Sequence, residues 1–236
     1  MHFRGCSGKE NRLPRSYHSG DTGDARAWIK HLKKQYPNTF LYAVGYSLGG
    51  NMLLKLLGEQ GSTSILSAAV SISAPMQLDI SAKRMERGFS KLYQYYLLRD
   101  LKESLRQKYK DHDMQSLIGL NPKEIGKIKN FHAFDEAYTA PIHGFDSADD
   151  YYQKSSARQF LKKIQIPTLI IQALDDPFMT DEILPEEAEL SSSIEIEVYP
   201  YGGHVGFVGG SLLRPRYWLE ERIISYFEEL ADREIF

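Results

Sequence analysis

The sequence predicts an α/β fold in which a mostly parallel sheet is covered by helices and an inserted helical cap lies over it. Three observations predict this. Short apolar runs of strand length alternate with helical patterns along the chain. Three of those runs are apolar almost throughout, which is typical of parallel strands buried on both faces. Between the second and third runs, roughly ninety residues contain no convincing strand, which exceeds an ordinary connection.

The predicted strands of this sheet cover residues 40–44, 68–73, 168–173 and 194–199. The first three are the continuous apolar runs, and each ends at a glycine, a proline or an acidic turn. The run 194–199 alternates apolar and acidic residues, so one of its faces is in water. We therefore expect it near an edge of the sheet. A further strand is expected at residues 1–4, just before an Arg-Gly turn.

The predicted helices that cover the sheet span residues 28–36, 51–57, 160–164 and 218–227. Asp21 or Asp24 can cap the first, and Ser155 or Ser156 can cap the third. The helix at 51–57 is almost wholly apolar, which predicts that it is buried.

The long segment without strands divides the chain. We predict an α/β core made of residues 1–75 and 166–236, and a helical cap inserted at 76–165. An amphipathic pattern over residues 89–105 supports the helical assignment. The alternative is a helical layer that packs elsewhere on the core. Aromatic residues are frequent in this segment, which suggests either internal packing or a pocket for an apolar acyl chain.

Composition excludes several classes of protein. The 236 residues suit a single domain with an insertion, and 29 basic against 31 acidic residues leave a formal charge of −2. This balance gives no reason to expect a nucleic-acid or anionic-membrane partner. Cys6 is the single cysteine, so an internal disulfide and a cysteine-based zinc site are excluded. With no apolar run of membrane-spanning length and no signal peptide, the sequence predicts a cytoplasmic protein of undetermined oligomeric state.

The sequence Gly45-Tyr46-Ser47-Leu48-Gly49 matches the pattern G-x-S-x-G. It follows a predicted strand and precedes a predicted helix, which is the setting of a nucleophile elbow. Such a turn strains the serine and presents its hydroxyl at the carboxyl end of the sheet, and we expect Gly45 and Gly49 to supply room for it. Ser47 is therefore the candidate nucleophile, and the Leu48 N–H is the candidate oxyanion donor. The alternative is a glycine-rich turn with an uninvolved serine.

A serine nucleophile needs a base and an orienting carboxylate, which follow the elbow serine in the order acid, then histidine. Asp175 and Asp176 come directly after the strand at 168–173, and we favour Asp176 because the following proline restricts its backbone. His204 is the one histidine beyond this pair, in a glycine-rich loop after the strand at 194–199. The other six histidines have no comparable placement, so we predict neither a metal site nor a cofactor.

Five ordered motifs make the chain resemble the YheT-like branch of the α/β-hydrolases, also called the AB hydrolase 4 family. The motifs are Phe3-Arg4-Gly5-Cys6-Ser7-Gly8, Tyr17-His18-Ser19-Gly20-Asp21-Thr22, Gly45 to Asn51, Asp175-Asp176-Pro177-Phe178 and Gly202-Gly203-His204-Val205-Gly206-Phe207. The resemblance implies a helical cap and a hydrolase that acts on small-molecule carboxylic esters without a cofactor. In that reading Ser47 is the nucleophile, Asp176 the acid and His204 the base.

The sequence departs from this family at its start. Members that resemble the chain carry earlier strands and a His-Gly loop that supplies a second oxyanion N–H, and no such loop is found here. We therefore expect a sheet without its N-terminal strands, one identifiable oxyanion donor at Leu48, and impaired activity. Either the chain is a fragment, or the turn from Gly5 to Gly8 partly replaces the loop. The alternative functions are an acyltransferase with the same triad and a non-catalytic remnant.

Overall fold

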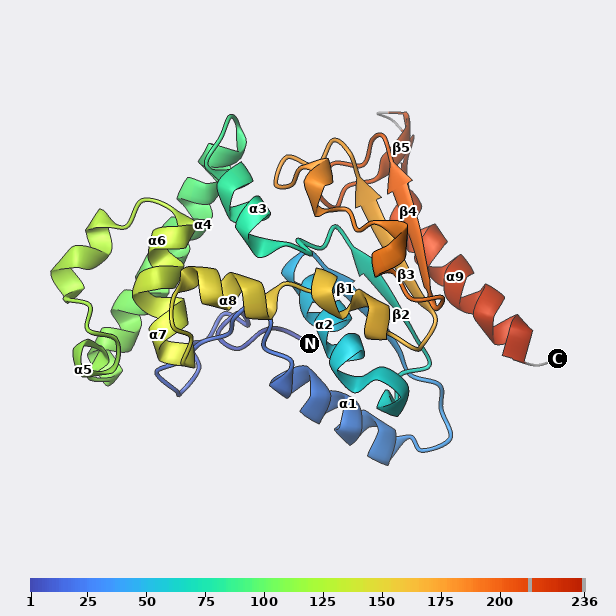
Figure 1. Cartoon of the computed structure of the whole chain (residues 1–236), viewed down its shortest axis with the longest axis horizontal. Coiled ribbons are helices and arrows are strands. Elements are labelled where there is room, and N and C mark those ends of the chain that lie inside the picture. Colours follow the sequence, from blue (N-terminus) through green and yellow to red (C-terminus); the bar gives the residue numbers. More distant parts are fainter. Residues whose placement is uncertain (212–213, 235–236) are drawn as a thin grey trace.

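The computed structural model describes residues 1–211 and 214–234. Its centre is a parallel sheet in the order β1 (Tyr42–Tyr46), β2 (Ala68–Ile72), β3 (Thr168–Ala173) and β4 (Ile194–Tyr199) (Figure 1). The four strands coincide closely with four of the predicted ranges. The predicted α/β fold with a parallel sheet is therefore confirmed.

The two central strands, β2 and β3, are buried along their whole length, as predicted. Strand β4 lies at one edge of the sheet, again as predicted. The expectation that the first strand is buried on both faces is wrong, because β1 forms the other edge of the sheet within the described residues. Tyr42, Val44 and Tyr46 on one face of β1 remain partly exposed, and only Tyr42 stacks on an aromatic ring of the last helix, Phe227.

Helices cover both faces of the sheet (Figure 1). Helix α2 (Leu48–Gln60) lies on one face, and helix α9 (Trp218–Glu234) lies on the other. The core below α2 contains Leu53, Leu54, Leu57, Leu161, Ile164 and Ile170, and the core below α9 contains Val70, Ile72, Leu169, Ile171, Leu219 and Ile223. Helix α1 (Gly23–Gln35) packs on α2 through Ala25 and Ile29. Burial of these apolar side chains fixes the α2 N-terminus at the end of β1.

Local predictions failed at three places. The N-cap of α1 is Thr22 and makes no side-chain capping bond, so neither Asp21 nor Asp24 caps this helix. The helix predicted at 160–164 is a 3-10 helix, η4 (Arg158–Lys163), with Ala157 rather than a serine at its N-cap. Residues 1–4 form no strand, since no partner strand lies beside them in the part of the chain described.

The segment between β2 and β3 is helical and lies to one side of the sheet (Figure 1). Its elements before η4 are α3 (Leu78–Met85), α4 (Ser90–Asp111), α5 (Met114–Ile118), η2 (Pro122–Lys127), α6 (Phe131–Phe134), the π-helix η3 (Asp135–Thr139), α7 (Ala140–His143) and α8 (Ala148–Ser155). It has a hydrophobic cluster of its own around Leu105, Met114 and Ile125. The exact cap boundaries at 76 and 165 stay a prediction.

The N-terminal segment, residues 1–22, runs without regular structure against this helical layer. The buried Lys108 ammonium of α4 donates hydrogen bonds to Asn11 Oδ1 at 2.8 Å and to the Leu13 carbonyl at 2.9 Å. The Tyr138 hydroxyl donates to the Pro14 carbonyl at 3.0 Å. These bonds satisfy polar groups that the packing removes from water, so they hold the first residues in place.

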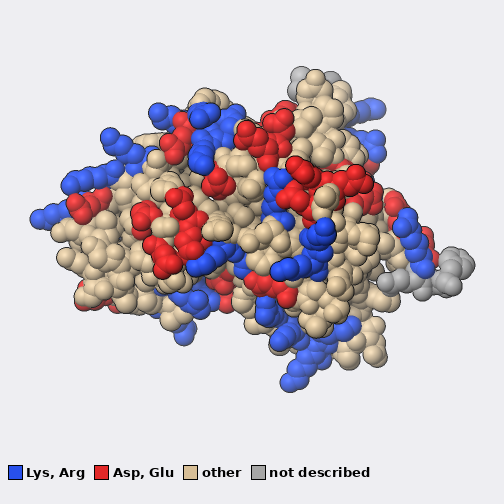
Figure 2. Space-filling model, viewed as in Figure 1, with Lys and Arg blue, Asp and Glu red and all other residues tan. Residues whose placement is uncertain are grey.

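The remaining elements are short: η1 (Gly61–Thr63), η5 (Asp181–Ile183), η6 (Glu187–Glu189), and an antiparallel pair made of β5 (Val208–Ser211) and β6 (Arg214–Tyr217). Acidic and basic side chains are interspersed over the visible face of the molecule, in keeping with the small net charge (Figure 2). Among the helices of the described chain, none has the length and apolar character needed to cross a membrane.

Candidate active site

The carboxyl ends of three parallel strands bring the predicted site residues together. Ser47 follows β1, Asp176 follows β3 by a short turn, and His204 lies in the loop after β4. Parallel strands place their carboxyl ends at the same edge of a sheet, where α/β proteins bind ligands. Three residues far apart in the sequence therefore meet over one edge.

Ser47 occupies a strained backbone conformation between β1 and α2. Its φ of 50° and ψ of −123° lie outside the regions that a non-glycine residue usually adopts. The neighbouring backbone holds it there, because the Ser47 N–H donates to the Ile72 carbonyl at 2.8 Å and the N–H of Gly50 and of Asn51 donate to the Ser47 carbonyl. A strained residue that its surroundings fix in place is typical of a functional turn.

Two glycines make this turn possible, and one of them differs from the prediction. A Cβ on Gly45 would lie 2.5 Å from the Gly49 carbonyl oxygen, and a Cβ on Gly50 would lie 2.6 Å from Ser71 Oγ. At Gly49 a Cβ would meet no atom within 4 Å. The prediction was right for Gly45 and wrong for Gly49, because the helix turns the Gly49 Cα outward and Gly50 toward the sheet.

These distances predict unequal effects of alanine at the two motif glycines. Gly45→Ala is expected to lower the free energy of unfolding by about 3 kcal/mol, because the new methyl group meets backbone that cannot rotate away. Gly49→Ala is the matched control and should change it by less than about 1 kcal/mol. Urea unfolding of both variants measures the difference. Equal losses would contradict the close approach of β1 and α2.

A continuous chain of hydrogen bonds joins the three predicted residues. His204 Nε2 lies 2.9 Å from Ser47 Oγ, and His204 Nδ1 lies 2.8 Å from Asp176 Oδ2. Asp176 is buried, with its carboxylate oriented by the Phe178 N–H, which donates to Oδ1 at 2.8 Å. An ionised carboxylate can only accept, so the proton is assigned to Nδ1 of the imidazole. Nε2 is then free to accept the Ser47 hydroxyl proton.

Asp175, the alternative carboxylate, has a different position. Its Oδ1 accepts hydrogen bonds from the N–H of Gly202 at 2.9 Å and of Gly203 at 2.8 Å. It therefore ties the turn after β3 to the loop that carries His204. Gly203 has a φ of 60°, and a Cβ on Gly202 would lie 2.5 Å from the Phe207 ring, so both glycines are needed for this tight loop.

Leu48 is the first residue of α2, so its N–H has no acceptor within the helix and lies at the positive end of the helix dipole. This placement agrees with its predicted part as an oxyanion donor, although that part stays a prediction. The turn from Gly5 to Gly8 is not among the described residues that line the cavity beside Ser47. It is therefore not a candidate for the second donor in this structure.

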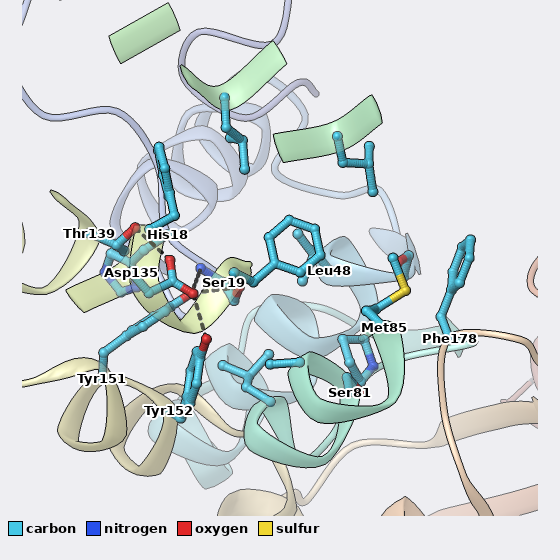
Figure 3. Close-up of a pocket in the computed structure, with 18 of the residues that line it drawn as sticks. His18, Ser19, Leu48, Ser81, Met85, Asp135, Thr139, Tyr151, Tyr152 and Phe178 are labelled. Atoms are coloured by element: carbon cyan, nitrogen blue, oxygen red, sulfur yellow. Dashed lines mark hydrogen bonds between the residues drawn. The ribbon is translucent and has the colours of Figure 1, made fainter. Parts of the chain in front are cut away.

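A cavity of about 430 Å³ opens beside the hydrogen-bonded chain, between the sheet edge and the cap (Figure 3). Ser47 and His204 line it. Its apolar wall consists of Leu48, Pro75, Leu78, Ala82, Met85, Leu97, Leu101, Phe131, Phe134, Phe178 and Met179. The Phe178 ring lies 4.5 Å from the His204 ring, which places an apolar surface directly against the imidazole. The volume suits a small organic ligand.

Sequence reasoning missed Asn51, which is completely buried behind the site. Its amide donates to the carbonyls of Ser19 and Ser155, both at 2.9 Å, and accepts from the Ala157 N–H at 2.9 Å. The Asn51 side chain therefore joins three parts of the chain: the N-terminal segment, helix α2 and the end of the cap. A polar residue inside the apolar run at 51–57 was the available signal.

A pair of partly buried histidines was also missed. The His18 and His143 rings are in edge contact, 4.7 Å apart, and His18 Nδ1 accepts from the Gly20 N–H at 3.2 Å. Burial lowers the pKa of His18 to about 3 and that of His143 to about 4, because the charged imidazolium would lose its hydration. Both rings are neutral at pH 7, and His18 lines the cavity.

These pKa values predict a loss of stability in acid. The unfolded chain binds protons on both histidines below their ordinary pKa of about 6.5, whereas the folded chain does not until about pH 4 and 3. Each histidine should therefore cost about 1 kcal/mol of unfolding free energy between pH 7 and pH 5, because solvent reaches both rings and weakens the full effect of the pKa shift. Asp135 offsets about 1 kcal/mol of this loss. Burial raises the pKa of its carboxyl to about 6, so between pH 7 and pH 5 the folded chain takes up a proton on Asp135 that the unfolded chain does not.

Urea unfolding at pH 7 and pH 5 measures this loss. The variant His18→Phe/His143→Phe should show a smaller drop between the two pH values than the unchanged chain. His31→Gln, on the exposed side of α1, is the control and should leave the drop unchanged. A drop of the same size in the double variant would contradict the assignment to this pair.

The amino-acid sequence matches a known protein family over most of its length. The model of the family described as alpha/beta hydrolase fold matches residues 1–211. The chain belongs to this family. The match includes residues 76–165 as well as the strands of the sheet, so the resemblance to the α/β-hydrolases drawn from the five motifs is confirmed.

Named relatives agree with this assignment. The chain is 44% identical over 223 residues to YheT of Escherichia coli (strain K12), which carries an esterase name; the match covers 94% of this chain and 65% of YheT. It is 30% identical over 231 residues to human phospholipase ABHD3, covering 97% of this chain and 56% of the relative. A human monoacylglycerol lipase, ABHD2, is 30% identical over 239 residues, covering 94% and 55%. The chain thus spans about half to two thirds of the length of these relatives.

Solved structures show the same fold at low sequence identity. The Pyrococcus furiosus esterase Pf2001 aligns with a TM-score of 0.54 at 16% identity, covering 99% of this chain and 68% of that one. An esterase from Exiguobacterium antarcticum aligns with a TM-score of 0.50 at 20% identity, covering 96% and 79%.

Proposed function

We propose that the chain carries the catalytic centre of a serine hydrolase that cleaves carboxylic esters. The observation that supports this proposal most strongly is the unbroken hydrogen-bond chain from Ser47 through His204 to Asp176, with Ser47 strained and open to the cavity. Nucleophile, base and orienting acid are each within hydrogen-bond distance of the next, which is the arrangement that activates a serine hydroxyl. The esterase and lipase names of the relatives agree with it.

In the acylation step, Ser47 Oγ attacks the ester carbonyl carbon while its proton passes to His204 Nε2. The C=O bond opens to a tetrahedral oxyanion, which the Leu48 N–H can stabilise. The oxyanion collapses, the bond to the alcohol oxygen breaks, and His204 returns the proton to the departing alkoxide. Asp176 keeps the imidazolium oriented and offsets its charge throughout.

In the deacylation step, water takes the place of the alcohol. His204 Nε2 accepts one proton from water as the oxygen attacks the acyl carbon of the Ser47 ester. A second tetrahedral oxyanion forms and collapses, the bond to Ser47 Oγ breaks, and His204 returns the proton to Ser47. The products are a carboxylic acid and an alcohol, and neither step uses a cofactor.

The cavity supports an ester with an apolar arm. The wall formed by Leu48, Leu78, Met85, Leu97 and Phe178 would exclude water from a hydrocarbon chain bound beside the serine. We therefore propose acyl esters of short or lipid-like chains as the substrate class, and p-nitrophenyl butyrate as the first substrate to assay.

A fluorophosphonate probe tests the proposal directly. We expect the folded chain to be labelled, and mass spectrometry of the peptides should map the adduct to Ser47 Oγ. Cooperative urea unfolding of the same sample establishes that the chain is folded. A folded sample that takes no label, or an adduct mapped to another residue, would contradict the assignment.

A further inference from the structure

The cavity has a polar side that the proposed ester cleavage does not use. In Figure 3 His18, Ser19, Asp135, Tyr151 and Tyr152 gather on one side of the pocket, and Met85 and Phe178 lie on the other, beyond Leu48. Leu48 directly follows the proposed nucleophile in the sequence. The polar group therefore lies away from the apolar wall next to His204, and it needs an explanation of its own.

Asp135 is the charged member of this group and comes from the π-helix η3 of the cap. Its Oδ1 accepts a hydrogen bond from Thr139 Oγ1 at 2.7 Å, and its Oδ2 accepts one from the Tyr152 hydroxyl at 2.7 Å. Both donors are neutral. Each carboxylate oxygen has a second lone pair, so this cavity-lining side chain retains acceptor capacity.

Among residues 1–211 and 214–234, no basic side chain forms an ion pair with this carboxylate, although the charge of a protonated His132 lowers the pKa of Asp135. The ring of His132, one turn away, pairs with Asp149 at 3.2 Å on the protein surface. His18, on the same side of the cavity, is neutral because burial lowers its pKa. Burial likewise raises the pKa of Asp135 to about 6, since the surrounding protein removes water from the carboxylate. Above that pH the cavity wall carries an unpaired negative charge.

A structural role alone does not account for a carboxylate at this position. The bond from Tyr152 ties η3 to α8, whereas the bond from Thr139 lies within the π-helix. A neutral amide could keep both contacts without the cost of burying a charge, because its oxygen can accept from one hydroxyl while its N–H donates to the other. The charge and the free acceptor positions, by contrast, are what a ligand bearing a hydrogen-bond donor would use.

We infer that Asp135 selects the substrate by accepting a hydrogen bond from a donor group, a hydroxyl or an ammonium, on the ester arm that occupies the cavity. The inference rests on the proposed function and makes the substrate class narrower: an ester whose apolar arm ends in, or carries, such a donor. Asp135 touches that arm and not the reacting carbonyl. It is therefore a specificity residue.

Fluorophosphonates with matched chains test this inference, because their single long chain can enter whichever arm of the site the cavity represents. Three series that differ only in the last group of the chain, methyl, hydroxyl or ammonium, are compared by their rate of Ser47 labelling at several chain lengths. An apolar cavity without an acceptor prefers the methyl group. We expect the reverse at the best length, with the hydroxyl or the ammonium probe faster by about 10-fold or more.

Two variants separate the hydroxyl from the ammonium. Asp135→Asn keeps an acceptor oxygen and removes the charge, so it should abolish a preference for ammonium and reduce a preference for hydroxyl only in part. Asp135→Leu removes both and should restore the preference for methyl. Glu136→Gln is the matched control, because this neighbouring carboxylate instead accepts from the Ala148 N–H, at 2.7 Å, and does not line the cavity.

The outcomes distinguish the inference from the proposed function. Labelling of the unchanged chain with no preference for a donor group would overturn the inference and leave the proposed function intact. Asp135→Asn that slows all three probes equally, or lowers only the melting temperature, would likewise overturn it and indicate a purely structural tie. A folded chain that none of the probes labels would contradict the proposed function, and the inference with it.

Discussion

Replacing Ser47 with alanine is expected to lower the turnover of p-nitrophenyl butyrate by about 10⁶-fold. The variant lacks the oxygen that His204 would activate, and no other serine hydroxyl of the described residues forms a hydrogen bond with that imidazole. The cavity walls are unchanged, so KM should change little. Steady-state hydrolysis, normalised to the folded fraction from urea unfolding, measures the effect.

Ser73→Ala is the matched control for this substitution. Ser73 also ends a strand with a positive φ, 49°, but it is fully buried and cannot meet a substrate. Its turnover should remain within a few-fold of the unchanged chain. If Ser47→Ala retained most of the activity, another residue would be the nucleophile and the hydrogen-bond chain at the sheet edge would have no part in catalysis.

The parts of this molecule that the sequence predicted well are those set by local signals. A strand that leads directly into G-x-S-x-G and an apolar helix determines the turn at Ser47 through sterics between near neighbours. Because β1, β3 and β4 are parallel, the residues after them all lie along the same edge of the sheet. The placement of Asp176 and His204 beside Ser47 therefore followed from topology, without knowledge of the packing.

What the sequence did not predict depends on contacts between distant segments. The burial of β1 depends on which strands flank it, and the apolar sequence of β1 does not indicate whether the strand lies at the centre or at the edge of the sheet. Gly50, rather than Gly49, needs to be small because of Ser71 on the neighbouring strand. Asp135 and His18 come from the cap and from the irregular N-terminal segment, and only the folded chain brings them to one cavity.

The second large effect on turnover is expected at Asp176, one of the two neighbouring aspartates. Asp176→Asn should lower turnover by about 10⁴-fold. The asparagine carbonyl can keep the bond from the Phe178 N–H, which leaves the amide NH₂ toward His204 Nδ1. An amide N–H donates to Nδ1, so the ring proton moves to Nε2 and that nitrogen can no longer accept the Ser47 proton. The fold should persist, because the substitution is nearly isosteric.

Asp175 separates a loss of the triad carboxylate from a loss of loop anchoring. Asp175→Asn keeps an oxygen for the N–H groups of Gly202 and Gly203, so its turnover should fall by less than about 10-fold. Asp175→Ala removes both bonds, and the freed His204 loop should lower kcat by about 10- to 100-fold with KM nearly unchanged, because misplacing the base weakens only the chemical step. Steady-state kinetics of the three variants ranks the carboxylates. A larger loss in Asp175→Asn than in Asp176→Asn would mean that Asp175, and not Asp176, orients the imidazole during the reaction.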